Sequence, residues 1–223
     1  MTTTRLLLAS ASPARRSTLS AAGLAPLVAV STVDEDAVLA AARERFGDLE
    51  PAEAVLVLAQ AKAEDVARRL DELDVPGWGD DEDVVVLGCD SMLELDGEIL
   101  GKPTDAPDAL ARWRAMRGRS GVLHTGHWLV DERDPADGGT RATLGATAST
   151  VVHFADLSDD EVAAYVATRE PLAVAGAFTI DGLGGPFVER IEGDHHNVVG
   201  VSLPALRHLL AEIDMTIPSL WRR

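Results

Sequence analysis

Apolar runs of strand length alternate with segments of helical periodicity along this chain of 223 residues. The apolar runs predict strands over residues 6–8, 26–30, 84–88, 122–130, 142–154 and 187–191. Helical spacing predicts a helix that begins at Pro13 and further helices over residues 51–73, 105–116, 158–168 and 203–213. Alternation of this kind is typical of an α/β fold, and the chain has no internal repeat.

Local polar signals support this division into elements. Asp96-Gly97 predicts a tight hairpin between two short strands, and Ser158 followed by Glu161 predicts a capping box. The strand over residues 26–30 is expected to end near V-D-E at residues 33–35. The acidic residues 71–83 and the residues 131–139, rich in Pro, Asp and Gly, predict loops.

Charge and cysteine content narrow the class of protein. A net charge of −17 argues against sequence-independent binding of nucleic acid or of anionic membranes. The single cysteine, Cys89, excludes an internal disulfide framework and a cysteine zinc site, and suits a reducing cytoplasm. The apolar run at residues 6–9 is shorter than the roughly 7 to 15 residues of a signal segment. We therefore expect a cytoplasmic protein with no nucleic-acid or membrane partner. The length and the absence of a long linker predict a single domain over residues 1–223, either one large α/β domain or two closely joined lobes.

The N-terminal segment R-L-L-L-A-S-A-S-P-A-R-R is suited to bind a phosphate. Pro13 fits the first position of a helix, which places Ser12 at the N-cap. Free amide hydrogens at the helix start, the hydroxyls of Ser10 and Ser12, and the guanidinium groups of Arg15 and Arg16 are all donors to anionic oxygens. An ordinary capped helix with two solvated arginines has the same local pattern.

Several other residues have both a functional and a plain interpretation. Asp90 follows a predicted buried strand. A polar residue at this place indicates a functional site, or it only caps the turn after the strand. Cys89 lacks a nearby histidine in sequence and is expected to be a small buried strand residue. His195 and His196 are adjacent and on an extended chain point to opposite faces, which favours a polar loop over a metal site. Three glycines either approach a nucleotide closely or permit a turn, namely Gly182, Gly184 and Gly185.

Several separated motifs give the chain a resemblance to the Maf family of nucleoside triphosphate pyrophosphatases. They occur in family order between Leu6 and Leu210 and cover nearly the whole sequence. The motifs are L-A-S-A-S-P-A-R-R-S-T-L, V-D-E, A-Q-A-K-A, V-L-G-C-D-S, L-D-G-E-I-L-G-K-P, H-T-G, V-H-F before L-S-D-D-E-V, A-G-A-F-T-I-D-G-L-G-G and N-V-V-G.

The resemblance implies hydrolysis of a nucleoside triphosphate between the α and β phosphates, giving a nucleoside monophosphate and pyrophosphate. It also implies a divalent metal, usually magnesium with manganese as an alternative, and a homodimer. The implied fold is a mixed twisted sheet with flanking helices, in two lobes around a central cleft, similar to inosine triphosphate pyrophosphatases. Matching the motifs places Asp90 as the catalytic aspartate, and Ser10, Ser12 and Arg15 on the phosphates, with Arg16 as their neighbour and Glu35, Lys62 and Lys102 in the same cleft.

These residue types suit the reaction. Asp90 is a candidate to accept a proton from water, to position the water, or to hold a metal, and the sequence does not separate these roles. Lys62 and Lys102 offset the negative charge of the phosphates, and Glu35 is an oxygen ligand of the kind magnesium prefers. Read alone, both lysines are ordinary surface residues, and Asp34-Glu35 is an ordinary helix start.

Departures from the family pattern concern the choice of base. Ala14 stands where the resemblance implies arginine in members that act on uridine and thymidine triphosphates, and tryptophan in members that act on 7-methylguanosine triphosphate. Ser91 replaces a threonine, and Asp181 replaces a glutamine whose amide both donates and accepts hydrogen bonds. The sequence therefore leaves the base open. It also leaves two functions: a pyrophosphatase for noncanonical or modified nucleotides, and a nucleotide-binding regulator of septum formation with slow hydrolysis.

Overall fold

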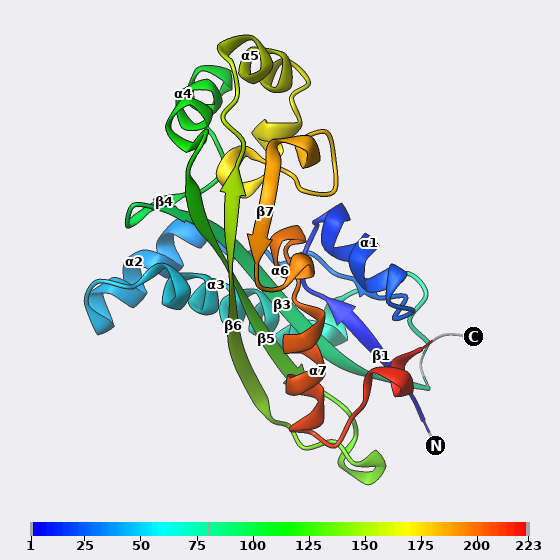
Figure 1. The fold of residues 1–223 in the computed structure, drawn as a ribbon. Helices are drawn as coiled ribbons and strands as arrows, with labels where there is room; N and C mark the ends of the chain where they lie inside the picture. Colours follow the sequence, from blue (N-terminus) through cyan, green and yellow to red (C-terminus); the bar gives the residue numbers. More distant parts are fainter. Residues whose placement is uncertain (1, 80, 222–223) are drawn as a thin grey trace. The chain divides into compact units, whose positions relative to one another are not determined.

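The computed structural model describes residues 2–79 and 81–221, and within them the predicted α/β class is confirmed. Seven strands form one mixed sheet in the order β2-β1-β3-β5-β6-β7, with β4 paired to β3 (Figure 1). The strands are β1 (Thr3–Leu8), β2 (Leu27–Val28), β3 (Glu82–Leu95), β4 (Glu98–Leu100), β5 (Ser120–Asp131), β6 (Thr143–Phe154) and β7 (Val188–Glu192). The α-helices are α1 (Pro13–Ala21), α2 (Glu35–Phe46), α3 (Pro51–Arg68), α4 (Ala106–Met116), α5 (Asp159–Ala167), α6 (His195–Val199) and α7 (Leu203–Ala211). No helix in the described part of the chain is long and apolar enough to cross a membrane.

The chain divides into two compact units. The first comprises Met1–Asp90, Thr125–Ala148 and Gly200–Arg223, and the second comprises Ser91–His124 and Ser149–Val199. Three strands, β3, β5 and β6, therefore contribute residues to both units. Each unit has its own apolar core, so each is described separately below.

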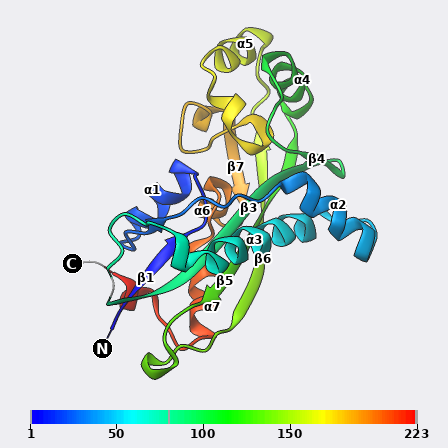
Figure 2. The ribbon, with the colours of Figure 1, turned by 180° about the vertical axis from the view of Figure 1, so that it is seen from behind.

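The first unit buries both faces of its strands. Alternate residues of β1 point to opposite faces, so Leu6 and Leu8 belong to one core and Leu7 to the other. The first core is completed by residues of α1 and α7, and the second by residues of α3. Figures 1 and 2 show α7 on one side of the strands and α3 on the other. The buried parallel pairing of β1 with β2 and β3 explains the continuous apolar run at Leu6–Leu8.

The second unit is built around Trp113 of α4. Its indole is fully buried, donates a hydrogen bond from Nε1 to the carbonyl of Ala177 at 2.7 Å, and contacts three aromatic rings edge to face. Helices α4 and α5 pack together in this core. The predicted capping box of α5 is present, because Ser158 Oγ accepts from the amide of Glu161 and Glu161 accepts from the amide of Ser158.

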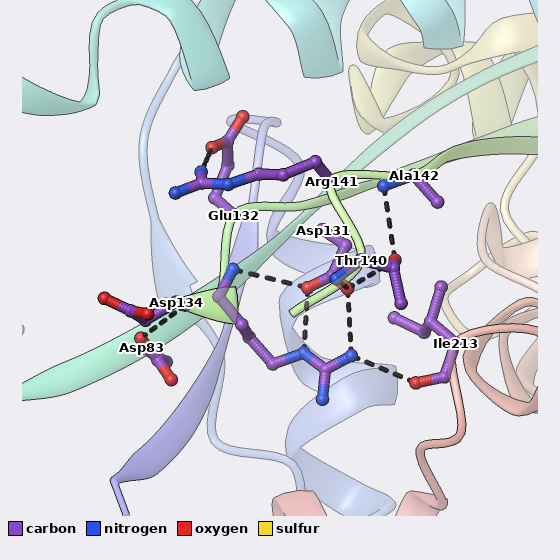
Figure 3. A network of polar contacts seen from close by, with 9 residues as sticks. Asp83, Asp131, Glu132, Asp134, Thr140, Arg141, Ala142 and Ile213 are labelled. Carbon is purple, nitrogen blue, oxygen red and sulfur yellow. Dashed lines mark hydrogen bonds and ion pairs between the residues drawn. The ribbon is translucent and has the colours of Figure 1, made fainter. Parts of the chain in front are cut away.

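A buried ion pair fixes the loop between β5 and β6. The carboxylate of Asp131, which is fully buried, accepts from Arg133 Nε at 2.8 Å and Nη2 at 2.9 Å, and from the amide of Thr140 at 2.8 Å. Arg133 Nη2 also donates to the carbonyl of Ile213 at 3.0 Å, just beyond α7. Figure 3 shows Asp131 at the centre of this network, with Thr140 and Ile213 beside it. The predicted loop is thus an ordered turn with a short 3₁₀ segment, Pro135–Asp137.

Several predicted elements have other bounds in the structure. The strand that was expected to end before Asp90 continues as β3 to Leu95, so Asp90 lies within a strand. The strand expected over residues 26–30 is only Leu27–Val28, and the helix expected over residues 51–73 ends at Arg68 and is followed by a 3₁₀ turn at Leu70–Glu72. Asp34 and Glu35, for which a helix start was the alternative interpretation, begin α2; only Ala42 of this helix is buried, so its sequence has little apolar periodicity. The Asp96-Gly97 hairpin is confirmed, with Leu95 paired to Glu98 and positive φ angles at both turn residues. Asp80, within the predicted acidic loop, lies outside the described residues.

Candidate active site

The strand, turn and helix expected at the N-terminus are present. Strand β1 leads to Ser10, and Ser12 caps α1, its Oγ accepting from the amide of Arg15 at 3.4 Å. Ser10 Oγ accepts from the amide of Ser12 at 3.2 Å. A cavity of about 410 Å³ opens at this turn, and it is lined by Ser10, Ala11, Ser12, Pro13, Arg16, Ser17, Ser20 and Val28. Hydroxyl groups and one exposed guanidinium therefore surround a space large enough for phosphate groups.

Lys62 joins two carboxylates in the first unit. Its ammonium Nζ lies 2.6 Å from Asp90 Oδ1 and 2.7 Å from Glu35 Oε1. Asp90 is 8% exposed and the Lys62 side chain 12%, whereas the Glu35 side chain is 53% exposed. Glu35 is the first residue of α2, which Asp34 caps by accepting from the amide of Ala37 at 3.0 Å. The V-D-E motif is thus a helix start that also supplies an acid to this cluster.

Small residues bring Lys62 to Asp90. Gly88 of β3 lies directly against α3, so that a Cβ at this position would be 2.2 Å from the carbonyl oxygen of Ala59 and 2.9 Å from Cβ of Ala63. Only glycine permits this close approach of strand and helix. Lys62 is adjacent to Ala63 on α3, and Asp90 is two residues beyond Gly88 on β3. The A-Q-A-K-A and V-L-G-C-D motifs therefore pack against each other, and this contact places Lys62 within ion-pair distance of Asp90.

Burial perturbs the acids of β3. Desolvation raises the pKa of Asp90, and the cations of Lys62 and Arg15 oppose this effect without cancelling it. Burial likewise raises the pKa of the Cys89 thiol to about 11, so the thiol is protonated at neutral pH. Cys89 belongs to the apolar core of the first unit, as the sequence predicted, and it is not a nucleophile of the site.

Arg15 is directed toward the protein's own main chain. Its Nε donates to the carbonyl of Gly200 at 2.7 Å, and its Nη1 donates to the carbonyl of Cys89 at 2.9 Å and to Ser10 Oγ at 3.1 Å. Ala14, beside it on α1, is partly buried, and Arg16 is exposed at the cavity. The first unit thus contains eight of the eleven residues predicted for the site: Ser10, Ser12, Ala14, Arg15, Arg16, Glu35, Lys62 and Asp90.

The second unit carries the other three residues predicted for the site: Ser91, Lys102 and Asp181. Ser91 is partly buried on β3, and Lys102 is exposed just after β4. The carbonyl of Gly101, which precedes Lys102, accepts from Arg112 Nη1 at 2.6 Å and from the amide of Gly176 at 3.1 Å. These bonds hold the backbone from which Lys102 extends.

Asp181 lies on a glycine-rich turn that Glu170 holds in place. The carboxylate of Glu170 accepts from the amides of Leu183 at 2.9 Å and Gly184 at 3.0 Å, and from the hydroxyl of Tyr165 at 2.8 Å. A Cβ on Gly182 would lie 2.5 Å from Glu170 Oε2, so glycine is needed here for close approach to a protein carboxylate. The turn expected at these glycines is present, and their close approach to a nucleotide stays a prediction. No local sequence signal marks Glu170 or Tyr165. They are five residues apart and bond to each other, but their other partners are more than ten residues away in sequence.

The adjacent histidines begin the short helix α6 (His195–Val199), so the extended polar loop expected there is corrected by the structure. His196 Nδ1 lies 3.3 Å from Asp194 Oδ1, whose oxygen also accepts from the His196 amide at 3.0 Å. Among residues 2–79 and 81–221, no group of three or more His, Cys, Asp or Glu side chains is placed to hold a metal ion. A metal bound by Glu35 and Asp90 therefore needs further ligands from substrate or water.

Comparisons with known proteins agree with the motifs. The family model described as "Maf-like protein" matches residues 5–213. A Salinispora tropica protein named "Nucleoside triphosphate pyrophosphatase" is 58% identical over 219 residues, covering 98% of this chain and 88% of its own length. Proteins of the same name from Streptomyces coelicolor and Nostoc punctiforme are 54% and 45% identical. Each match covers 97% of this chain, and the matches cover 94% of the Streptomyces protein and 97% of the Nostoc protein. With these matches spanning nearly its whole length, the chain belongs to the Maf family.

Proposed function

We propose that this chain is a nucleoside triphosphate pyrophosphatase, which cleaves the bond between the α and β phosphates and releases a nucleoside monophosphate and pyrophosphate. The activity for which relatives up to 58% identical over nearly the full chain are named supports this. The structural observation that best supports this activity is the Lys62 ammonium, which lies between the carboxylates of Asp90 and Glu35. The same unit contains the cavity lined by hydroxyl groups. A triphosphate needs fixed cations and hydroxyl donors, and hydrolysis needs a carboxylate beside them.

Asp90 is the proposed general base. A water oxygen forms a bond to phosphorus as the bond from that phosphorus to the bridging oxygen breaks, and the water proton passes to the Asp90 carboxylate. Burial raises the pKa of Asp90, which makes its carboxylate a stronger base than an exposed aspartate. Lys62 keeps one oxygen of Asp90 in place at 2.6 Å. Its positive charge also offsets charge that develops on the phosphates.

The phosphates are proposed to bind to hydroxyl and cationic side chains. Arg16 and the hydroxyls of Ser10 and Ser12 line the cavity at the start of α1, where the helix amides favour an anion. Lys102 is proposed to contact the same substrate, supported by its exposure and by its place in the G-K-P motif. Ala14, Ser91 and Asp181 are proposed to govern the choice of base, because they are the positions at which this chain departs from the family pattern.

A divalent cation, magnesium or manganese, fits the donor set. Glu35 and Asp90 each contact the Lys62 ammonium through one oxygen, Oε1 at 2.7 Å and Oδ1 at 2.6 Å, so the two carboxylates lie close together and each has a second oxygen for a metal beside Lys62. Two carboxylates with substrate phosphate oxygens are a usual way to bind magnesium. Bound there, the metal would supply positive charge to the phosphates and acidify water.

A homodimer and a cytoplasmic location complete the proposal. The single cysteine, buried in the core, is compatible with a reducing compartment. Sedimentation of the purified chain measures its oligomeric state directly, and a mass of one chain at micromolar concentration contradicts the dimer.

The experiment is a panel of canonical, methylated and deaminated triphosphates with magnesium, assayed for pyrophosphate and orthophosphate. We expect pyrophosphate from at least one triphosphate, and we expect Asp90→Asn to lower kcat by about 10²- to 10⁴-fold, the usual contribution of a general base. Thermal unfolding of the variant checks that it is folded. Release of orthophosphate alone, or an unchanged rate in the Asp90→Asn variant, refutes the mechanism.

A further inference from the structure

Arg15 is bound on several sides by groups of the protein itself. Its guanidinium donates to the carbonyls of Gly200 at 2.7 Å and Cys89 at 2.9 Å, and to Ser10 Oγ at 3.1 Å. These acceptors come from three separate segments of the first unit: the turn after β1, the middle of β3, and the residue that directly follows α6. A planar guanidinium presents its donors in a fixed fork, so the three segments are held in one arrangement.

We propose that Arg15 is a positioning residue for the reaction, which holds Asp90 and Ser10 in place through Cys89 and the Ser10 hydroxyl. This inference rests on the proposed function. The Cys89 carbonyl belongs to the peptide group that continues directly into Asp90, so a bond to this oxygen restrains the backbone that carries the carboxylate. Arg15 thus acts on the same carboxylate that Lys62 contacts directly.

The contact with Ser10 orients a hydroxyl. Ser10 Oγ accepts from Arg15 Nη1 and from the amide of Ser12, which occupies both acceptor positions of a hydroxyl. The hydroxyl proton of Ser10 is then the group left to donate, and Ser10 lines the cavity at the helix start. Arg15 therefore prepares Ser10 as a donor to a phosphate oxygen.

The neighbouring arginine has a different environment. Arg16 is exposed and lines the cavity beside Ser12 and Ser17, whereas Arg15 is directed to main-chain carbonyls. The basic pair is thereby divided between two tasks, with Arg16 toward the substrate and Arg15 toward the protein. This division makes Arg16 a matched comparison for Arg15, because the two have the same side chain at adjacent positions.

The test compares Arg15→Lys, Arg15→Gln and Arg16→Gln, with Arg43→Gln on the exposed surface of α2 as the control. Lysine keeps the charge but cannot reproduce the fork, so we expect Arg15→Lys to lower kcat by about 10²-fold with little change in KM. Arg15→Gln also loses the fork, so its kcat falls at least as far as that of Arg15→Lys. Arg16→Gln raises KM and leaves kcat near that of the wild type, and Arg43→Gln changes neither.

A second measurement does not depend on activity. The ¹³C shift of the Cys89 carbonyl and the ¹⁵N–¹H shift of the Asp90 amide are recorded by NMR in the wild type and the variants, and circular dichroism checks that each is folded. Because Arg15 donates to this carbonyl, we expect both shifts to move in Arg15→Gln and to stay unchanged in Arg16→Gln. Arg15 variants that raise KM at unchanged kcat, or Cys89 and Asp90 shifts that Arg15→Gln leaves unmoved, overturn the inference. If the wild type hydrolyses no triphosphate, the proposed function fails, while the NMR shifts still decide the role of Arg15.

Discussion

Replacing Asp131 by alanine removes the acceptor at the centre of a buried network. The carboxylate accepts from the Arg133 amide at 3.3 Å, from Arg133 Nε and Nη2 at 2.8 and 2.9 Å, and from the amide and hydroxyl of Thr140 at 2.8 and 2.7 Å. Its side chain is fully buried and that of Arg133 is 9% exposed. Alanine leaves the Arg133 charge buried with the Ile213 carbonyl as an acceptor but with no counter-ion in this network (Figure 3).

The expected loss is about 3 to 5 kcal/mol in the free energy of unfolding, the range for removing one partner of a buried ion pair. With a urea m-value of about 2 to 3 kcal/mol/M, this loss lowers the unfolding midpoint by roughly 1 to 2.5 M. Urea unfolding at pH 7, followed by circular dichroism, measures the midpoint directly.

The matched control is Glu132→Ala at the next position. Glu132 pairs with Arg141, but their side chains are 25% and 55% exposed, so the expected loss is about 0 to 1 kcal/mol. A loss for Asp131→Ala no larger than that for Glu132→Ala refutes the reasoning.

The pH dependence gives a further check. Burial by itself raises the pKa of Asp131, but the hydrogen bonds from Arg133 and Thr140 together lower it by more, so that the pKa lies below its usual value. The ionised form is therefore favoured by folding, and its contribution is complete above the unfolded-state pKa of about 3.9 and is lost as pH falls through the folded-state pKa. The stability difference between wild type and Asp131→Asn should be constant near neutral pH and shrink below about pH 4.

Two further predictions concern the ion pair of the candidate site. Lys62→Met removes the nearest cation from Asp90, so the Asp90 pKa should rise further and the acidic limb of the kcat/KM profile should move to higher pH. Lys62→Arg keeps the charge and should leave this limb in place. Equal shifts of the limb in both variants contradict the electrostatic cause. Gly88→Ala places a Cβ 2.2 Å from the Ala59 carbonyl oxygen, so it should lower the unfolding midpoint. It should also lower kcat, because it separates α3 from β3. A variant with wild-type stability contradicts the packing argument.

Local sequence determined the elements whose signals are complete within a few residues. Ser12 and Pro13 cap α1, Asp96-Gly97 closes the β3–β4 hairpin, and Ser158 with Glu161 caps α5, because each signal depends on hydrogen bonds or φ angles of neighbouring residues. The motifs also identified the family and the residues that the first unit brings together. Their order along the chain was sufficient for that identification.

Only the tertiary structure decided what those residues contact. Lys62 reaches Asp90 across 28 positions of sequence because Gly88 lets a helix lie against the strand, and no local pattern encodes that approach. Arg15 was predicted as a phosphate ligand from its local motif, a role that stays a prediction, and two of its acceptors within the chain, the carbonyls of Cys89 and Gly200, are 74 and 185 positions away. A side chain's type fixes which partners it is able to bind, but the packing of distant segments fixes which of them lie within hydrogen-bonding distance.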